Sequence, residues 1–193
     1  MGAIFQSLGR TVTAGVVLVV VLIIAAGSGI KFDHTWGAFV MRWLHVLSGV
    51  MWIGLLWYSN FVQMPSMPKI PDEQKPAIGK VIAPEALFWF RWAALSTLVT
   101  GLILATMNGY IGNLFTFARP FTAIAIGMWL GAIMAFNVWF IIWPNQKKAL
   151  GIVQVEADAK AKAARTAMLA SRFNTMLSIP MLYCMVAQQN GGL

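Results

Sequence analysis

The sequence RWLHVLSGVMWIG, residues 42–54, decides the fold. It places an arginine, Arg42, and a histidine, His45, inside a stretch that is otherwise apolar and, with its flanks, long enough to cross a bilayer. Ionisable groups are costly in hydrocarbon, so their presence there points to function. The chain has two histidines, His34 and His45. Chemistry that needs an imidazole within the membrane therefore depends on His45.

The overall composition indicates a membrane protein. Of the 193 residues, 59% are hydrophobic and 10% are charged, whereas a soluble domain has about 25% charged residues. Apolar segments of about 20 residues cross a bilayer, so the chain has room for about five. We therefore predict an all-α fold, a polytopic membrane helix bundle of about five transmembrane helices that forms a single integral membrane domain over residues 1–193.

Five apolar segments carry this prediction. They cover residues 12–30, 36–62, 87–108, 121–143 and 168–187. The small residues that close the first segment are also typical of a signal-peptide cleavage region, but we expect the segment to be retained. Polar connections occupy 63–86, which holds five prolines and is expected to be loop, and 144–167.

The distribution of positive charge predicts the orientation. Eleven of the 14 Lys and Arg residues fall on the side that carries the N-terminus and these two connections. The positive-inside rule then places the N-terminus in the cytoplasm and the C-terminus in the periplasm, with a bacterial inner (cytoplasmic) membrane as the host. The net charge of +8 is explained by anionic lipid, so we expect the lipid bilayer and no nucleic acid as a partner.

The surroundings of His45 leave two main interpretations open, besides a role in substrate binding. His45, Ser48, Gly49 and Trp52 share one helix face, and the small residues leave space for a neighbouring helix or a porphyrin plane. In one interpretation, His45 forms a hydrogen bond to another helix. In the other it is the metal ligand of a haem b, with His45, Arg42 and Trp52 as candidate cofactor-binding residues. A second ligand would be a methionine, of which there are twelve, or would come from another subunit.

The remaining sequence features indicate helix packing, and common catalytic motifs are absent. Gly127 and Gly131 have the small-xxx-small spacing that lets helices approach closely. Cys184 is the one cysteine, which excludes an intrachain disulfide. The sequence has no Gly-rich phosphate loop, nucleophile elbow or zinc-ligand spacing.

Three segments together resemble a known family, the membrane domain at the N-terminus of bacterial membrane-bound urate oxidases (urate hydroxylases). They are residues 42–54 with NFVQMP at 60–65, PEALFWFRW at 84–92 followed by Thr100 and Gly101, and SRFNT at 171–175 with LSIP at 177–180. In this family, a c-type cytochrome domain often follows the membrane domain. We expect a short stand-alone form that lacks the cytochrome c domain.

The resemblance implies a function and a partner. It implies a component of urate or purine oxidation, an oxidoreductase part that passes electrons to a separate cytochrome c or to a quinone. The alternative is a non-catalytic accessory or structural subunit of a larger respiratory or photosynthetic membrane complex. Both imply other membrane subunits or a homo-oligomer as partners. The family motifs add the candidate residues Asn60, Gln63, Glu85, Arg91 and Asn174.

Overall fold

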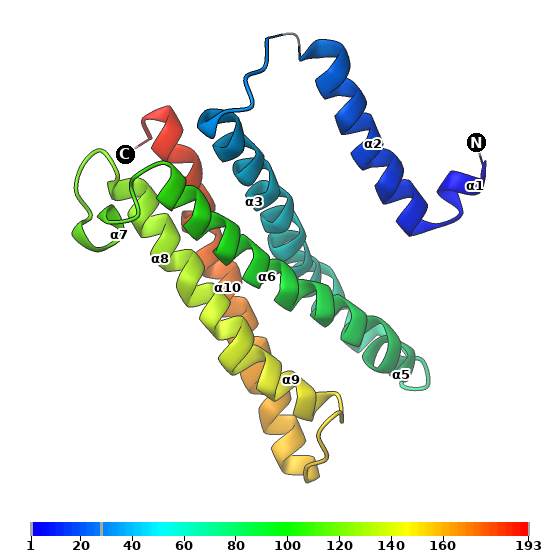
Figure 1. The fold of residues 1–193 in the computed structure, drawn as a ribbon. Helices are drawn as coiled ribbons and strands as arrows, with labels where there is room; N and C mark the ends of the chain where they lie inside the picture. Colours follow the sequence, from blue (N-terminus) through cyan, green and yellow to red (C-terminus); the bar gives the residue numbers. More distant parts are fainter. Residues whose placement is uncertain (1, 28, 193) are drawn as a thin grey trace. The chain divides into compact units, whose positions relative to one another are not determined.

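The computed structural model describes residues 2–27 and 29–192, and all regular structure in them is helical. The chain divides into two compact units, Met1–Gly37 and Ala38–Leu193. The first unit holds α1 (Gly2–Phe5) and α2 (Leu8–Ala26), and α3 (His34–Trp57) starts at its end. The elements that follow α3 are η1 (Tyr58–Gln63), α4 (Met64–Ser66), η2 (Met67–Lys69), α5 (Lys75–Ala77), η3 (Ile78–Ile82), α6 (Ala83–Met107), α7 (Asn113–Thr116), α8 (Thr122–Phe136), η4 (Asn137–Ile142), α9 (Trp143–Ala149) and α10 (Ala157–Asn190) (Figure 1).

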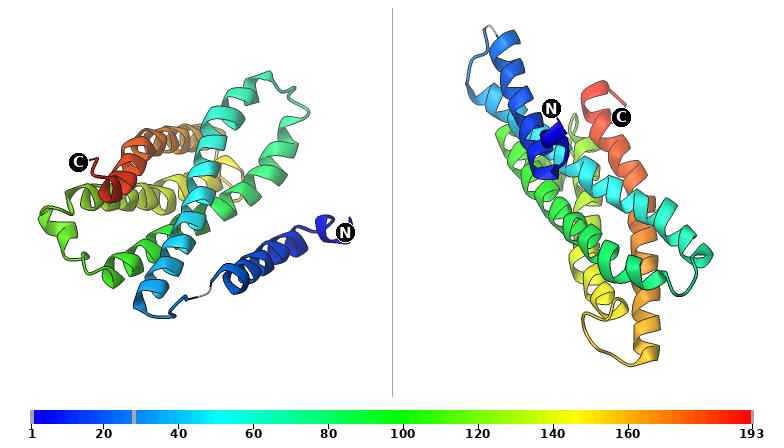
Figure 2. Two further views of the ribbon diagram at one scale, coloured as in Figure 1. Left: turned by 90° about the horizontal axis from the view of Figure 1, so that it is seen from above. Right: turned by 90° about the vertical axis from the view of Figure 1, so that its right-hand side faces the viewer.

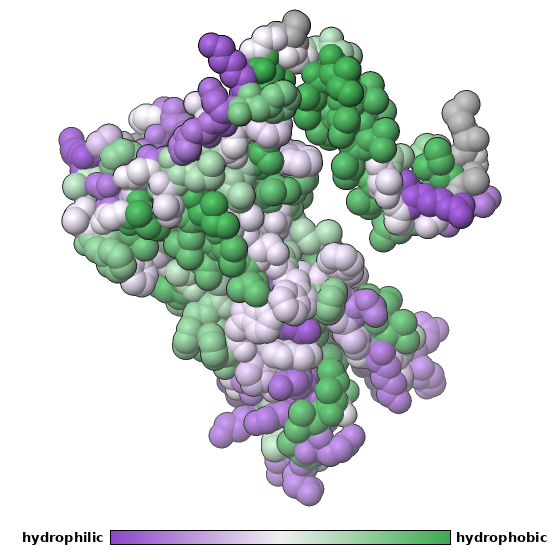
Figure 3. Space-filling model, viewed as in Figure 1, coloured by the Kyte–Doolittle hydropathy of each residue, from purple (hydrophilic) through white to green (hydrophobic). Residues whose placement is uncertain are grey.

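Among the described residues, four helical segments are long and apolar enough to cross a membrane. They are Leu8–Ala26, His34–Lys69, Lys75–Met107 and Thr122–Ala149. The predicted all-helical membrane bundle is confirmed to this extent. In the second unit, apolar residues cover the middle of the helices and hydrophilic residues collect towards the two ends, around α7 and around α5 and α9 (Figure 3). This is the distribution that a bilayer requires.

The proline-rich connection at 63–86 is largely helical, and the prediction of a loop there was wrong. Pro65, Pro68, Pro76 and Pro84 each stand within the first two positions of a short or long helix. Pro76 follows a turn, where the N–H it lacks has no partner within the helix, whereas Pro65 and Pro84 lie in continuous helical segments, directly after the π-helical η1 and η3. Pro144 stands in the same way at the start of α9, so the helix that we expected to end near residue 143 continues to Ala149.

The last helix is longer than its apolar part. α10 runs without a break through Ala157–Asn190, with Pro180 inside it, whereas the sequence indicated an apolar span only over 168–187. Its buried face consists mostly of small or polar residues: Ala163, Ala167, Ser171, Asn174, Ser178, Met181, Cys184 and Ala187. Small residues bring helix backbones close together. α10 accordingly packs most extensively on α8, which runs beside it in the opposite direction (Figure 2).

Gly127 and Gly131 have the small-xxx-small spacing, and Gly127 is the one in close contact with α10. A Cβ at Gly127 would lie 3.1 Å from Cys184 Cβ and 3.3 Å from Met185 Cε of α10, whereas a Cβ at Gly131 would meet nothing within 4 Å. Gly127 is therefore the position at which α8 needs a glycine against α10.

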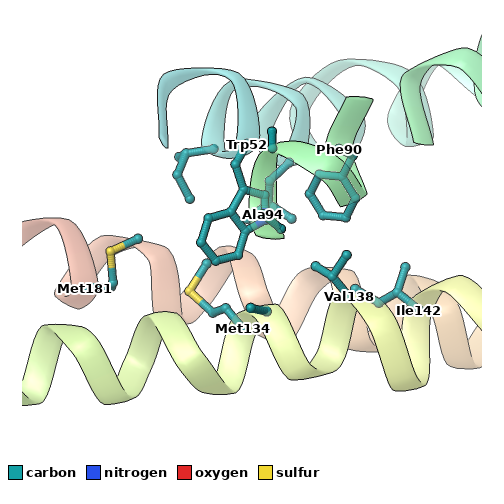
Figure 4. Packing of buried hydrophobic residues seen from close by; sticks show 11 residues of the cluster. Trp52, Phe90, Ala94, Met134, Val138, Ile142 and Met181 are labelled. Atoms are coloured by element: carbon teal, nitrogen blue, oxygen red, sulfur yellow. The ribbon is translucent and has the colours of Figure 1, made fainter. Parts of the chain in front are cut away.

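A core of buried side chains joins the four long helices of the second unit. Trp52 of α3 is 2% exposed and packs with Phe90 and Ala94 of α6 and with residues of the η4 and α10 segments. Figure 4 shows the Trp52 indole above Met134, with Met181 of α10 beside them. This cluster fixes the middle of α3 against the other helices and so positions the part of α3 that carries His45.

Candidate functional site

His45 is held by α6. Its Nδ1 lies 2.9 Å from the backbone oxygen of Thr97 and 3.3 Å from Thr100 Oγ1. A carbonyl oxygen can only accept a hydrogen bond, so Nδ1 carries the proton. Nε2 is then the unprotonated nitrogen, with a lone pair for a donor or a metal ion. The ring thus faces another helix, as the sequence analysis expected, and one nitrogen remains available for chemistry.

Gly101 provides the space for this imidazole. A Cβ at Gly101 would lie 2.9 Å from His45 Cε1, 3.2 Å from Nδ1 and 3.9 Å from Nε2. The ring edge with Cε1 and Nδ1 therefore rests on the backbone of α6, and Nε2 is the ring nitrogen farther from Gly101. Thr97 and Gly101 belong to a face of small residues in this span, which the sequence did not connect with His45. The run of small residues around Thr100 indicates that another helix approaches this span closely, but it does not show which helix.

His45 borders two adjoining cavities. The larger has a volume of about 880 Å³ and the smaller about 190 Å³, and both are lined by His45 and Trp52. The walls of the larger cavity come mainly from α3, α6, α8 and α10, and they are mostly apolar. The residues shared by both cavities are His45, Trp52, Thr97, Gly101, Met128, Met181 and Met185. Known ligand sites occupy about 300–1,000 Å³ and are mainly apolar, which fits the larger cavity.

One end of the larger cavity is polar. Arg42 lines it together with Asn108, Tyr110, Gln188, Gln189 and Asn190. The guanidinium of Arg42 donates to the side-chain oxygen of Gln189 when that amide is oriented to satisfy both groups. Burial raises the pKa of Tyr110, and the nearby charge of Arg42 lowers it. An ordinary phenol has a pKa of about 10, so Tyr110 keeps its proton at neutral pH and can donate a hydrogen bond.

Trp52 combines a buried ring with an unused donor. Its Nε1 is buried and has no hydrogen-bond partner among the described residues, although Trp52 lines both cavities. A buried indole N–H usually finds a partner. The three candidate cofactor-binding residues, Arg42, His45 and Trp52, are thus brought together on the wall of one cavity.

Asn60, Asn137 and Asn174 have structural contacts and lie outside the lining of this cavity. Asn174 is fully buried, donates to the backbone oxygen of Met134 and accepts from Asn137 Nδ2, both at 2.9 Å. Asn60 Nδ2 donates to Ser171 Oγ at 2.8 Å. Asn60 and Asn137 both lie in π-helical segments, η1 and η4, in which the wider turn offsets the side chains relative to an α-helix. These contacts attach both segments to the polar face of α10.

Three further candidates lie outside the cavity lining. Arg91 is stacked over the Trp143 ring, with Cζ 3.4 Å from the ring centroid, a cation–π contact. Glu85 is exposed in the first turn of α6, and Gln63 ends η1. The structure therefore does not bring Gln63, Glu85 or Arg91 to His45.

The described residues do not form a metal site from the usual ligands. Within residues 2–27 and 29–192, no group of three or more His, Cys, Asp or Glu side chains is placed to hold a metal ion. Any metal at His45 would therefore need to arrive within a cofactor that supplies most of its own ligands.

Comparison with known proteins agrees with the resemblance seen in the sequence. Residues 111–191 match the family model described as urate oxidase N-terminal. No curated protein and no solved structure matches the chain. The matched region extends from before α7 to the end of α10 and includes Met128, Met181 and Met185, whereas His45 lies before it. The predicted resemblance to a urate oxidase N-terminal domain is thereby confirmed over these residues.

Proposed function

We propose that this chain is the membrane-embedded component of a system that oxidises urate or a related purine and passes the electrons to a separate cytochrome c or to a quinone. The observation that carries the proposal is the cavity of about 880 Å³ that His45 lines, with its Nδ1 hydrogen-bonded to the Thr97 carbonyl and its Nε2 left unprotonated. The match of residues 111–191 to the urate oxidase N-terminal family supplies the class of reaction.

The electrons and protons released in the reaction indicate what role the chain has. Hydroxylation of a purine by water adds one oxygen atom to the ring and releases two protons and two electrons. A quinone takes up both electrons and both protons, whereas two one-electron cytochromes take up the electrons and leave the protons in solution. The chain's role is to hold the group through which these electrons leave the substrate side.

A fifth membrane span in α10 is part of this proposal. Large apolar side chains form an exposed stripe along α10: Leu169, Phe173, Met176, Ile179, Tyr183 and Val186. At 1.5 Å per residue the stripe is about 26 Å long, close to the thickness of a hydrocarbon core. The opposite face is small and polar, which lowers the mean hydropathy of the helix, and Arg172 near the start of the stripe is exposed.

The orientation follows from five spans and the bias of positive charge. We place the N-terminus in the cytoplasm and the C-terminus in the periplasm of a bacterial inner membrane. A periplasm-dependent reporter fused after residue 193 should be active, and a cytoplasm-dependent reporter at the same position should be inactive. Activity of the cytoplasmic reporter would show that α10 does not cross the membrane.

Replacement of the two histidines tests the function. In the bacterium that encodes this chain, deletion of its gene should abolish urate-dependent reduction of cytochrome c or quinone by isolated membranes. His34→Ala should restore this reduction and His45→Ala should not, because His34 is exposed at the start of α3 whereas His45 faces the cavity.

The alternative function gives a different result. If the chain is a non-catalytic accessory subunit, urate-dependent reduction will be unchanged by the deletion. The amount of an assembled respiratory or photosynthetic complex will fall instead, and His45→Ala will restore it as well as the wild type does. That result would refute the proposed role in purine oxidation.

A further inference from the structure

The hydrogen bond of His45 prepares it to bind a metal. Nδ1 donates to the Thr97 carbonyl, which fixes the tautomer and the ring orientation. Metal-binding histidines are typically fixed in this way, by a hydrogen bond from the ring nitrogen that does not bind the metal. Nε2 in this tautomer can only accept a hydrogen bond or donate its lone pair to a metal ion.

The size and polarity of the cavity indicate a large, flat, mainly apolar occupant. A single purine is small and carries polar groups on most of its edge, and in an apolar cavity of about 880 Å³ most of these groups would have no partner. A tetrapyrrole ring instead offers a wide apolar surface. It also supplies four ligands to its metal, which this chain does not provide.

The wall contributed by α8 and α10 carries the second type of ligand. Met128 of α8 and Met181 and Met185 of α10 line both cavities together with His45. Histidine and methionine are an established pair of axial ligands to haem iron. Figure 4 shows Met181 on the α10 side of the core, across from Trp52 of α3.

The charge at the polar end distinguishes a haem from a quinone. Arg42 is the one charged residue in the described lining of the larger cavity, and an arginine binds carboxylates well. Haem b carries two carboxylates on one edge, whereas a quinone is neutral and offers Arg42 no carboxylate. The available residues therefore fit a haem.

We infer that the larger cavity binds one haem b, with His45 Nε2 as one axial ligand, a methionine among Met128, Met181 and Met185 as the other, and the haem carboxylates directed to Arg42. This inference rests on the proposed function, because it identifies the group through which the electrons leave. When bound, the haem supplies a one-electron carrier. The protein positions it, ligates it and excludes water from it.

Titration of the purified protein with haemin tests the inference. The detergent-solubilised full chain, stripped of any haem, should bind one haemin per chain and give the Soret band of a six-coordinate low-spin haem. His45→Gly should lose this spectrum, and added imidazole should restore it, which shows that the variant is folded. His34→Ala should bind as the wild type does. A wild-type spectrum for His45→Gly without imidazole would overturn the inference.

The second ligand and the carboxylate contact have their own variants. One of Met128→Leu, Met181→Leu and Met185→Leu should change the spectrum to that of a haem without a thioether ligand. Met134→Leu should not, because Met134 is fully buried and lies outside the cavity lining. Arg42→Gln should weaken haemin binding about 10-fold, the lower end of the loss for groups that support a ligated metal. If all three methionine variants keep the wild-type spectrum, methionine ligation is wrong.

The two proposals can fail separately. One outcome is a chain that supports urate-dependent reduction of cytochrome c or quinone in membranes and yet binds no haemin. That result would refute the haem site and leave the proposed function in place. A chain that binds one haemin through His45 but contributes nothing to urate-dependent reduction would refute the proposed function and leave the haem site.

Discussion

Replacing Gly101 by alanine should displace the His45 imidazole and lower urate-dependent reduction between about 10- and 100-fold, because a displacement of about 1 Å at a reactive group is sufficient for such a loss. The added Cβ would lie 2.9 Å from Cε1 and 3.2 Å from Nδ1, closer than real Cβ contacts. The imidazole then has to leave the Thr97 carbonyl. Nε2 would no longer be fixed as the free nitrogen.

Gly79→Ala provides the matched control. Gly79 is also helical, in η3, and a Cβ there would meet nothing within 4 Å. This variant should keep wild-type reduction. Thermal unfolding in detergent should show both variants folded, with Gly101→Ala destabilised by about 1–3 kcal/mol as is usual for overpacking. Wild-type reduction by Gly101→Ala would mean that the contact between His45 and α6 has no functional role.

Replacing Asn174 by alanine should give the largest loss of stability, about 2–4 kcal/mol in the free energy of unfolding. Its amide joins Met134 of α8 and Asn137 of η4 to α10, and Asn137 is itself buried. A simple interhelical hydrogen bond contributes only about 0.6 kcal/mol. We expect Asn174→Ala to cost more than this, because it leaves buried polar groups without a partner. Each such group costs about 1–3 kcal/mol.

Asn190→Ala is the control on the same helix. Asn190 is exposed and donates to the backbone oxygen of Val186 within α10, so its loss should change stability by less than about 0.5 kcal/mol. Equilibrium unfolding in mixed micelles measures both variants. Equal stabilities for Asn174→Ala and Asn190→Ala would show that the polar contact between α10 and α8 does not hold the bundle together.

The helical class and the apolar spans were predictable because they depend on local composition. A run of about 20 apolar residues has one stable conformation in a bilayer, a helix. The helical connection at 63–86 was missed because proline disrupts a helix interior but not its first turn. The alanine-rich stretch at 149–172 could be recognised as helical from its i,i+4 charge pairs, but the sequence did not show that it joins the apolar segment at 168–187 in the single helix α10.

The candidate site was predictable only in part. Arg42, His45 and Trp52 could be selected because ionisable and aromatic groups stand out within an apolar span. The cavity, the Gly101 contact and the methionine wall depend on the distances between helices that are far apart in the sequence. Arg91 was selected from a family motif, and its contact with Trp143 was missed because a sequence does not show which aromatic ring a cation will meet.

A structure of the protein isolated from its own membrane, determined by electron cryo-microscopy, tests the central claim most directly. The account predicts density for a planar group in the cavity bounded by α3, α6, α8 and α10, with its centre within bonding distance of His45 Nε2 and an edge at Arg42. A cavity filled only by lipid chains, or closed by contact of α3 with α10, would contradict it.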